Sequence, residues 1–306
     1  TRVFREVCRV GETLKAISEL AGSEVKSQVA MIYDWDSRWA MEDSKGPRND
    51  GLHHQEMLLK YYRAFRKQGM NVDLIDMDCS IEGYQVLVLP MTYMFKQGFA
   101  EKVRAFVEQG GVLITTYWSG IADDTDRCYL GGTPHGLMDV LGLRSTEIDG
   151  LFDWEENQFM PVDGNELGLF REYTCKYLCD LVRLDGAQAL MTYGSDFYQG
   201  YPALTVNRYG KGSAWYVAAD AEQVFQEDFI AKLLEYEKIC GAVPGEIPEG
   251  LEVTTRETED VRYYIYQNFG AGRVMLPLPE GETETVFGDP KQELEPYGLV
   301  VLRQRK

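Results

Sequence analysis

The sequence lacks the patterns that mark the most common classes of ligand-binding and membrane proteins. Lysine and arginine total 31 against 49 aspartates and glutamates, which gives a net charge of -18. Nucleic acid and anionic membranes repel a surface of this sign, so the charge balance excludes both as partners. No apolar run is long enough to cross a bilayer. The acidity itself is explained by solubility.

Cysteines are few and irregularly spaced. There are 6 in 306 residues, and none forms a CxxC motif. A chain of this length with 44% hydrophobic residues builds a large core without disulfide staples. We therefore expect reduced thiols in a cytoplasmic protein. Cys175 and Cys179 stand four apart with no histidine nearby, which predicts free core thiols rather than a zinc site. We expect no metal and no cofactor.

Apolar runs alternate with helical patterns from about residue 28 to residue 242. Because short buried strands between helices are typical of a parallel sheet covered on both faces, we predict a flavodoxin-like, class I amidotransferase-like doubly wound α/β fold. Residues 118–175 are less regular and predict an insertion over one end of the sheet. The predicted strands are 29–33, 72–75, 86–89, 112–117, 177–184 and 187–193, with a hairpin at 202–208 and 213–219 turned by 210–212, and the predicted helices are 52–68, 99–107 and 221–239.

Two further segments flank this region. Residues 1–24 repeat apolar side chains at steps of three and four, which predicts an amphipathic helix connecting to a preceding domain. Pro244 to Gly250 has the composition of a linker, and short alternating strands follow it. We predict a connector at 1–24, an α/β domain at 25–243 and a small antiparallel all-β domain at 244–306. The β strands are expected at 251–255, 261–268, 273–278, 284–287 and 298–302.

Five motifs in order carry a family resemblance. They read VAMIYDWDSRWAMEDSKGPRNDG (29–51), LVLPMTYMF (87–95), GGVLITTYWSG (110–120), RYGKGSAWYVAA (208–219) and LEPYGLVVL (294–302). Together they resemble the second and third domains of glycoside hydrolase family 42 β-galactosidases. The resemblance covers nearly the whole chain.

The resemblance implies a division of labour. The family places a TIM barrel before an α/β trimerisation domain and a small β domain, and its two catalytic glutamates lie in the barrel. The sequence has no counterpart of that barrel, so no catalytic residue is carried over. We expect a non-catalytic homotrimerisation fragment, whose parent hydrolyses terminal non-reducing β-D-galactosides with retention of configuration. Galactoside is a partner only through that barrel.

Charged and aromatic residues follow the first predicted strand, and we expect them in a loop running from Asp34 to Gly51. Ligands of doubly wound folds bind beyond the carboxyl ends of strands, so a galactoside rim is one interpretation. The other is an interface anchored by tryptophan and arginine, which we favour. Exposed side chains are also expected at 91–95, including Met91 and Met94. The candidates are Asp34, Trp35, Asp36, Arg38, Trp39, Tyr93, Phe95 and Trp118.

Two other functions stay open. Ser119 with His135, or a cysteine, would serve an amidotransferase-like hydrolase, although the elbow lacks the G-x-S-x-G pattern. Trp35, Trp39 and Trp118 would serve a carbohydrate-binding module. For the other polar groups we expect structural roles only. These are a loop at 131–136, a solvated turn at 123–126, surface charge at 155–156, and capping or surface positions for His53 and His54.

Overall fold

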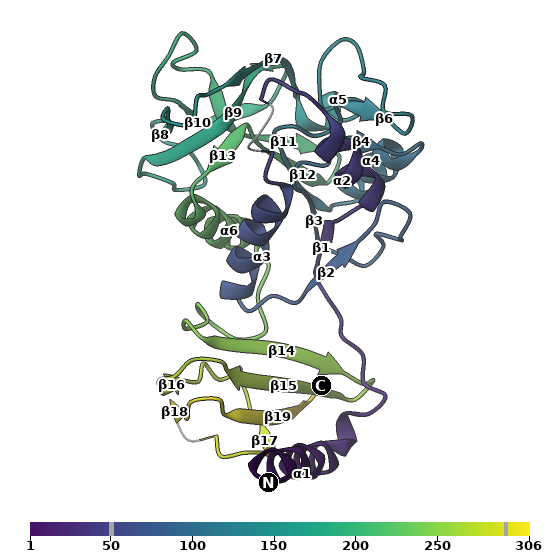
Figure 1. Ribbon diagram of the computed structural model, residues 1–306, viewed down its shortest axis with the longest axis vertical. Helices are drawn as coiled ribbons and strands as arrows, with labels where there is room; N and C mark the ends of the chain where they lie inside the picture. Colours follow the sequence, from purple (N-terminus) through teal and green to yellow (C-terminus); the bar gives the residue numbers. More distant parts are fainter. Residues whose placement is uncertain (49–51, 291–292) are drawn as a thin grey trace. The chain divides into compact units, whose positions relative to one another are not determined.

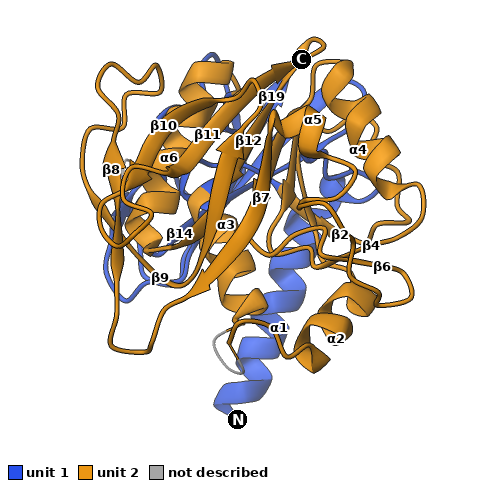
Figure 2. Cartoon of the chain, turned by 90° about the horizontal axis from the view of Figure 1, so that it is seen from above, with its two compact units in different colours: residues 1–27, 65–71, 240–306 blue, residues 28–64, 72–239 orange. Residues whose placement is uncertain are grey.

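The computed structural model describes residues 1–48, 52–290 and 293–306. The chain divides into two compact units (Figure 2). The α/β unit contains residues 28–64 and 72–239, and the β unit contains residues 1–27, 65–71 and 240–306. The end of the first family motif, residues 49–51, lies outside the described residues.

A parallel core organises the α/β unit. Its strands follow the order β2–β1–β3–β5–β12, the arrangement of flavodoxin-like folds, and this confirms the predicted fold class. β1, β3 and β5 are buried along their whole length, as uninterrupted apolar runs require. The strands are β1 (Val29–Ile32), β2 (Val72–Ile75), β3 (Val86–Leu89), β5 (Val112–Thr116) and β12 (Gly212–Val217).

The same sheet continues through antiparallel strands. The prediction that 118–175 is an insertion over the sheet is wrong, because this segment supplies β7, β8 and the start of β9. β7 and β8 both pair with β9, and β8 also pairs with β10. The order beyond β12 is β11–β10–β8–β9–β13. Their bounds are β7 (Leu143–Gly150), β8 (Asn157–Pro161), β9 (Tyr173–Leu184), β10 (Gln188–Tyr193), β11 (Pro202–Tyr209) and β13 (Ala219–Ala221).

The predicted hairpin is confirmed as β11 and β12, which turn at Gly210 and Lys211. Gly210 has a φ of +58°, and a Cβ there would lie 2.6 Å from the Cα of Glu108. Only glycine meets both conditions without strain. The second strand ends at Val217, and Ala219–Ala221 leaves it to pair with β9 as β13.

Helices cover both faces of the parallel core. Figure 1 shows α3 and α6 on one side and α4 on the other. The predicted loop at 34–51 is corrected, because α2 occupies most of its described part. The carboxylate of Asp34 accepts hydrogen bonds from the backbone N–H of Asp36 and Ser37, and this cap starts the helix. The helices are α2 (Trp35–Asp43), α3 (His54–Lys67), α4 (Phe99–Glu108), α5 (Met138–Leu141) and α6 (Gln223–Glu237), and a short parallel pair joins β4 (Met94–Phe95) to β6 (Ala122–Asp123).

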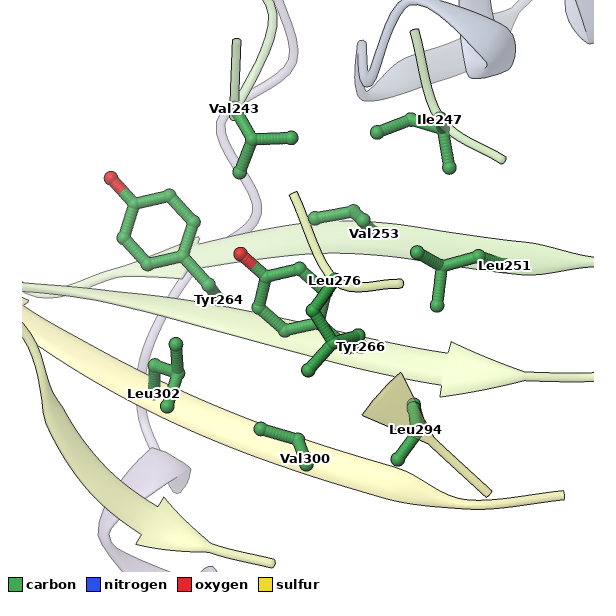
Figure 3. Packing of buried hydrophobic residues seen from close by; sticks show 10 residues of the cluster. All are labelled: Val243, Ile247, Leu251, Val253, Tyr264, Tyr266, Leu276, Leu294, Val300 and Leu302. Carbon is green, nitrogen blue, oxygen red and sulfur yellow. The ribbon is translucent and has the colours of Figure 1, made fainter. Parts of the chain in front are cut away.

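The β unit contains the antiparallel sheet that the sequence predicts. Its order is β14–β15–β19–β17, and β16 pairs with β18 beside it. Alternate residues of β14 are buried, so one face of the sheet forms a core (Figure 3). This core contains Val253, Tyr266 and Val300. The strands are β14 (Leu251–Glu257), β15 (Val261–Asn268), β16 (Val274–Met275), β17 (Glu284–Phe287), β18 (Glu293–Leu294) and β19 (Leu299–Arg305).

The first segment of the β unit is α1 (Arg2–Ala16), which a short 3₁₀ turn at Ser18–Leu20 follows. The helix predicted at 1–24 is confirmed but ends at Ala16. None of its side chains is buried, and its apolar stripe of Val3, Val7, Val10 and Leu14 faces solvent. Within the described residues, no helix is both long and apolar enough to span a membrane.

Candidate functional site

An exposed aromatic surface lies at the carboxyl end of β1. Trp35 and Trp39 stand about one turn apart on α2, with ring centroids 5.7 Å apart. The Tyr33 ring meets Trp35 edge-on at 5.3 Å. The two indoles remain 52% and 59% exposed. We call Tyr33, Trp35, Arg38 and Trp39 the α2 face.

Arg38 fixes this face. Its guanidinium lies 5.2 Å from the Trp35 ring centroid and 5.9 Å from that of Tyr33. It donates hydrogen bonds to Glu42 Oε1 at 2.8 Å and to the Tyr33 hydroxyl. The hydrogen bond to Glu42, followed by that to Tyr33, raises the pKa of Arg38 above its usual value. A cation held over two rings orients them before any partner arrives.

A charge network anchors the helix below the face. Lys96 Nζ lies 2.9 Å from Asp34 Oδ2 and 3.1 Å from both Asp36 Oδ2 and Asp78 Oδ2. Burial opposes the lysine charge, but the three carboxylates outweigh it and raise the pKa of Lys96 above its usual value. Asp34 is buried, and its oxygens also accept from the backbone N–H groups of Ser37 and Met77. Asp34 therefore positions α2, and its oxygens already have partners.

His54 lies beneath the face, and its assignment to a capping or surface position is corrected. Its ring stacks on Tyr33 with centroids 5.6 Å apart and planes 9° from parallel. The side chain is buried because the first turn of α3 turns it toward Tyr33. Burial, and then the charge of Arg38, lowers the pKa of His54 to about 4. The imidazole is therefore neutral at physiological pH.

Exposure of residues 91–95 is also corrected. Tyr93, Phe95 and Trp118 are buried, as are Met91 and Met94. Tyr93 packs on Trp118 with ring centroids 5.9 Å apart, and Phe95 meets Phe99 edge-on. The Met94 N–H donates to Ser37 Oγ at 3.1 Å, which ties this layer to α2. These aromatics support α2 from below and contribute no exposed surface in the isolated chain.

The elbow after β5 carries no visible catalytic pair. Ser119 is buried, and its Oγ accepts from the Thr92 N–H at 3.1 Å and donates to the Leu89 carbonyl at 3.4 Å. His135 instead stacks on Tyr129 at 3.8 Å. The described residues hold no hydrogen bond between Ser119 and His135. The hydrolase alternative thus gains no support from the geometry.

A second exposed aromatic pair escaped the sequence analysis. Phe152 and Trp154, in the loop between β7 and β8, stack with centroids 4.8 Å apart and planes 3° from parallel. They are 61% and 78% exposed. The available signal is two aromatic side chains directly before Glu155 and Glu156, in the acidic stretch LFDWEE, where only those two glutamates were interpreted, as surface charge.

The remaining polar clusters have structural roles. Asp123 accepts from Thr125 and from the Arg127 N–H, so residues 123–126 form a turn closed by that carboxylate. Cys175 and Cys179 are buried free thiols, as predicted. A hydrogen bond with Cys179, together with burial, raises the pKa of Cys175. Over the described ranges, no three His, Cys, Asp or Glu side chains gather in a way that would hold a metal ion.

Comparison with known proteins identifies the family. Residues 27–240 match the β-galactosidase trimerisation domain, and residues 250–304 match the β-galactosidase C-terminal domain. β-Galactosidase BglY of Alicyclobacillus acidocaldarius is 42% identical over 99% of the chain, and β-galactosidase Pbg of Clostridium perfringens is 38% identical over 100%.

Solved structures agree. The β-galactosidase of Rahnella sp. R3 superposes on 100% of the chain with a TM-score of 0.93 and 42% identity, and that of Bacillus circulans on 99% with 0.92 and 32%. The chain spans 45% of the length of each of these four proteins. The chain therefore belongs to the glycoside hydrolase family 42 β-galactosidases, as their trimerisation domain followed by their C-terminal domain.

Proposed function

We propose that this chain assembles three copies of a β-galactosidase and does not itself catalyse hydrolysis. The observation that carries the proposal is the match of residues 27–240 to a trimerisation domain whose surface presents the preorganised α2 face. In this proposal, the whole protein hydrolyses terminal non-reducing β-D-galactosides with retention. Two glutamates of a TIM barrel, outside these residues, perform the reaction.

The α2 face is the proposed contact between copies. Tryptophan and arginine are enriched among the few residues that contribute most of the binding energy at protein interfaces. Trp35 and Trp39 leave about half of their surface in water, and Arg38 holds the Trp35 ring, which in turn contacts the Trp39 ring. Asp34 and Asp36 keep α2 anchored through Lys96.

We propose that the α1 helix connects to the barrel and packs against it. Its apolar stripe of Val3, Val7, Val10 and Leu14 is spaced like one face of a packed helix, yet every member is exposed. Amide hydrogen exchange tests this assignment. The amides of α1 should exchange fast in this chain and slowly in a polypeptide that includes the barrel. Equal exchange rates in both polypeptides would contradict packing of α1 against the barrel.

We also propose that the chain is cytoplasmic and that its domains span residues 1–24, 25–243 and 244–306. The Pro- and Gly-rich segment from Pro244 to Gly250 supports the second limit, and the six free cysteines support a reducing compartment. Limited proteolysis tests the limit. Cleavage should occur first within 244–250 and leave an α/β fragment of constant size.

Light scattering over a concentration series tests assembly. A chain of 34.9 kDa should form a species of three times that mass at high concentration and dissociate on dilution. A monomer at every concentration would contradict the proposal.

A carbohydrate-binding module is the second candidate, favoured by the exposed Trp35 and Trp39 but not by the buried Trp118. Saturable calorimetric titration of the chain with galactosides would support that candidate instead.

A further inference from the structure

The loop between β7 and β8 holds two stacked aromatic rings in water. We call residues 152–155 the aromatic tip. Phe152 and Trp154 lie almost parallel, and most of each side chain is exposed. Isolated apolar side chains on a surface need no explanation, but two large rings stacked on one turn present a contiguous apolar surface. Aromatic side chains of this kind are enriched at the centres of interfaces.

The tip is rigid before any partner binds. The Phe152 N–H donates to Glu155 Oε2 at 2.9 Å, and the Glu155 N–H donates to the Phe152 carbonyl at 2.9 Å. Asp153 forms an ion pair with Arg48. The Leu151 N–H donates to the Tyr177 carbonyl at 2.9 Å and fixes the base of the loop on β9. A partner therefore meets ordered rings and loses little conformational entropy on binding.

The tip and the α2 face are neighbours on the α/β unit. The chain leaves α2 at Ser44 and reaches Arg48 four residues later, a span of at most about 14 Å. At that point Arg48 pairs with Asp153, and a Cβ on Gly150 would lie 3.2 Å from the Pro47 carbonyl oxygen. One short segment thus connects two exposed aromatic surfaces.

The geometry of a closed ring explains why the tip and the α2 face would lie near each other on one copy. A cyclic trimer repeats one head-to-tail contact, so each copy must present two different surfaces that fit each other. The two side faces of each copy converge at the three-fold axis, so surfaces that meet there are close together on one copy. Interface residues that contribute most energy also tend to pair with their like on the partner.

We propose that the aromatic tip of one copy packs against the α2 face of the next copy, and that this contact closes the trimer. The proposal rests on the assembly function above and names its two surfaces. A second copy fits better than a sugar, because the two rings cover one another's inner faces and the family match assigns assembly to this domain.

Complementation between two variants tests the proposal. The first variant, Phe152→Ala with Trp154→Ala, lacks the tip. The second, Trp35→Ala with Trp39→Ala, lacks the face. Each alone should be monomeric, with a dissociation constant raised at least about 30-fold. Mixed in equal amounts, they should form a dimer and nothing larger, because each supplies the surface that the other has lost.

The controls separate this proposal from the assembly function. Phe170→Ala with Phe197→Ala removes two rings that are 72% and 69% exposed on other loops, and it should leave the trimer intact. Far-ultraviolet circular dichroism should show that every variant keeps the native secondary structure, because each altered side chain is more than half exposed.

If the variant Phe152→Ala with Trp154→Ala still forms a trimer, this proposal is overturned and the assembly function stands. Two monomeric variants that fail to form a dimer when mixed would overturn the head-to-tail pairing. A wild-type monomer at all concentrations would overturn both proposals. Galactoside binding that disappears with Trp154→Ala, without any change of mass, would assign the tip to sugar instead.

Discussion

Replacing Asp180 with asparagine should stabilise the α/β unit at neutral pH and leave its stability unchanged in acid. Asp180 lies on β9 with no exposed surface, and its Oδ2 accepts a hydrogen bond from the Tyr216 hydroxyl. Burial raises the pKa of Asp180 from 3.8 to about 7, against the opposing effect of the Tyr216 and Ser145 hydroxyls and the Trp118 backbone. Asparagine keeps an acceptor for Tyr216 and carries no charge.

The sign and size follow from proton linkage. Between pH 3.8 and about 7, the folded protein holds a proton on Asp180 that the unfolded chain has released. Stability therefore falls as pH rises through this window and is constant above it. A shift of about three pKa units corresponds to about 4 kcal/mol, an upper bound because a buried site relaxes when it ionises. Asp180→Asn should recover up to this amount at pH 8 and nothing at pH 4.

Urea unfolding followed by tryptophan fluorescence measures the effect. All five tryptophans belong to the α/β unit, so the signal reports the unit that contains Asp180. The quantity to plot is the difference in unfolding free energy between Asp180→Asn and wild type against pH. Asp163→Asn, after β8, is the matched control, because it makes the same chemical change at an exposed position. A flat line for Asp180→Asn would refute the reasoning.

Three further predictions follow from the same geometry. The His54 imidazole should titrate near pH 4 by NMR, and folding stability should fall by about 3 kcal/mol as pH drops from 6.5 to 4; titration near 6.5 would contradict its burial. Gly210→Ala should destabilise the α/β unit by about 1 to 3 kcal/mol in urea, because a Cβ there meets the Glu108 backbone and the residue needs a positive φ; an unchanged midpoint would count against that contact. Raising the salt concentration should tighten assembly in sedimentation experiments, because copies of charge -18 repel one another; weaker assembly in salt would indicate ion pairs at the interface.

The parallel core was predictable because its signal is local. Fully buried strands read as continuous apolar runs, and Val86–Leu89 carries only valine and leucine. The β11–β12 hairpin is marked by Gly210, whose positive φ a turn requires. In the β unit, β14 alternates buried and less buried residues, which is the pattern of a one-sided sheet.

In the antiparallel extension, local patterns predicted β9, β10 and β11 but not β7 and β8. Leu143 of β7 pairs with Leu184 of β9, forty-one positions away, and shifts of register interrupt that pairing. Strands of this kind are specified by partners rather than by their own periodicity. α2 is similar, because its nine residues form no continuous apolar stripe and the helix depends on the Asp34 cap.

The candidate site was half predictable for the same reason. Trp35, Arg38 and Trp39 were found because they follow a buried strand, and they form one surface. Burial of Tyr93, Phe95 and Trp118 depends on elements that the sequence does not place next to them. A Cβ on Gly120, for example, would lie 2.8 Å from the Phe95 ring, so that ring packs closely against a distant backbone.

The central claim is that these residues assemble the protein and do not turn over substrate. Native mass spectrometry of the chain, incubated with a nitrophenyl β-galactoside, reads assembly, ligand binding and hydrolysis together. We expect a complex of three chains, no bound sugar and no released nitrophenol. A single chain that carries or cleaves the galactoside would contradict it.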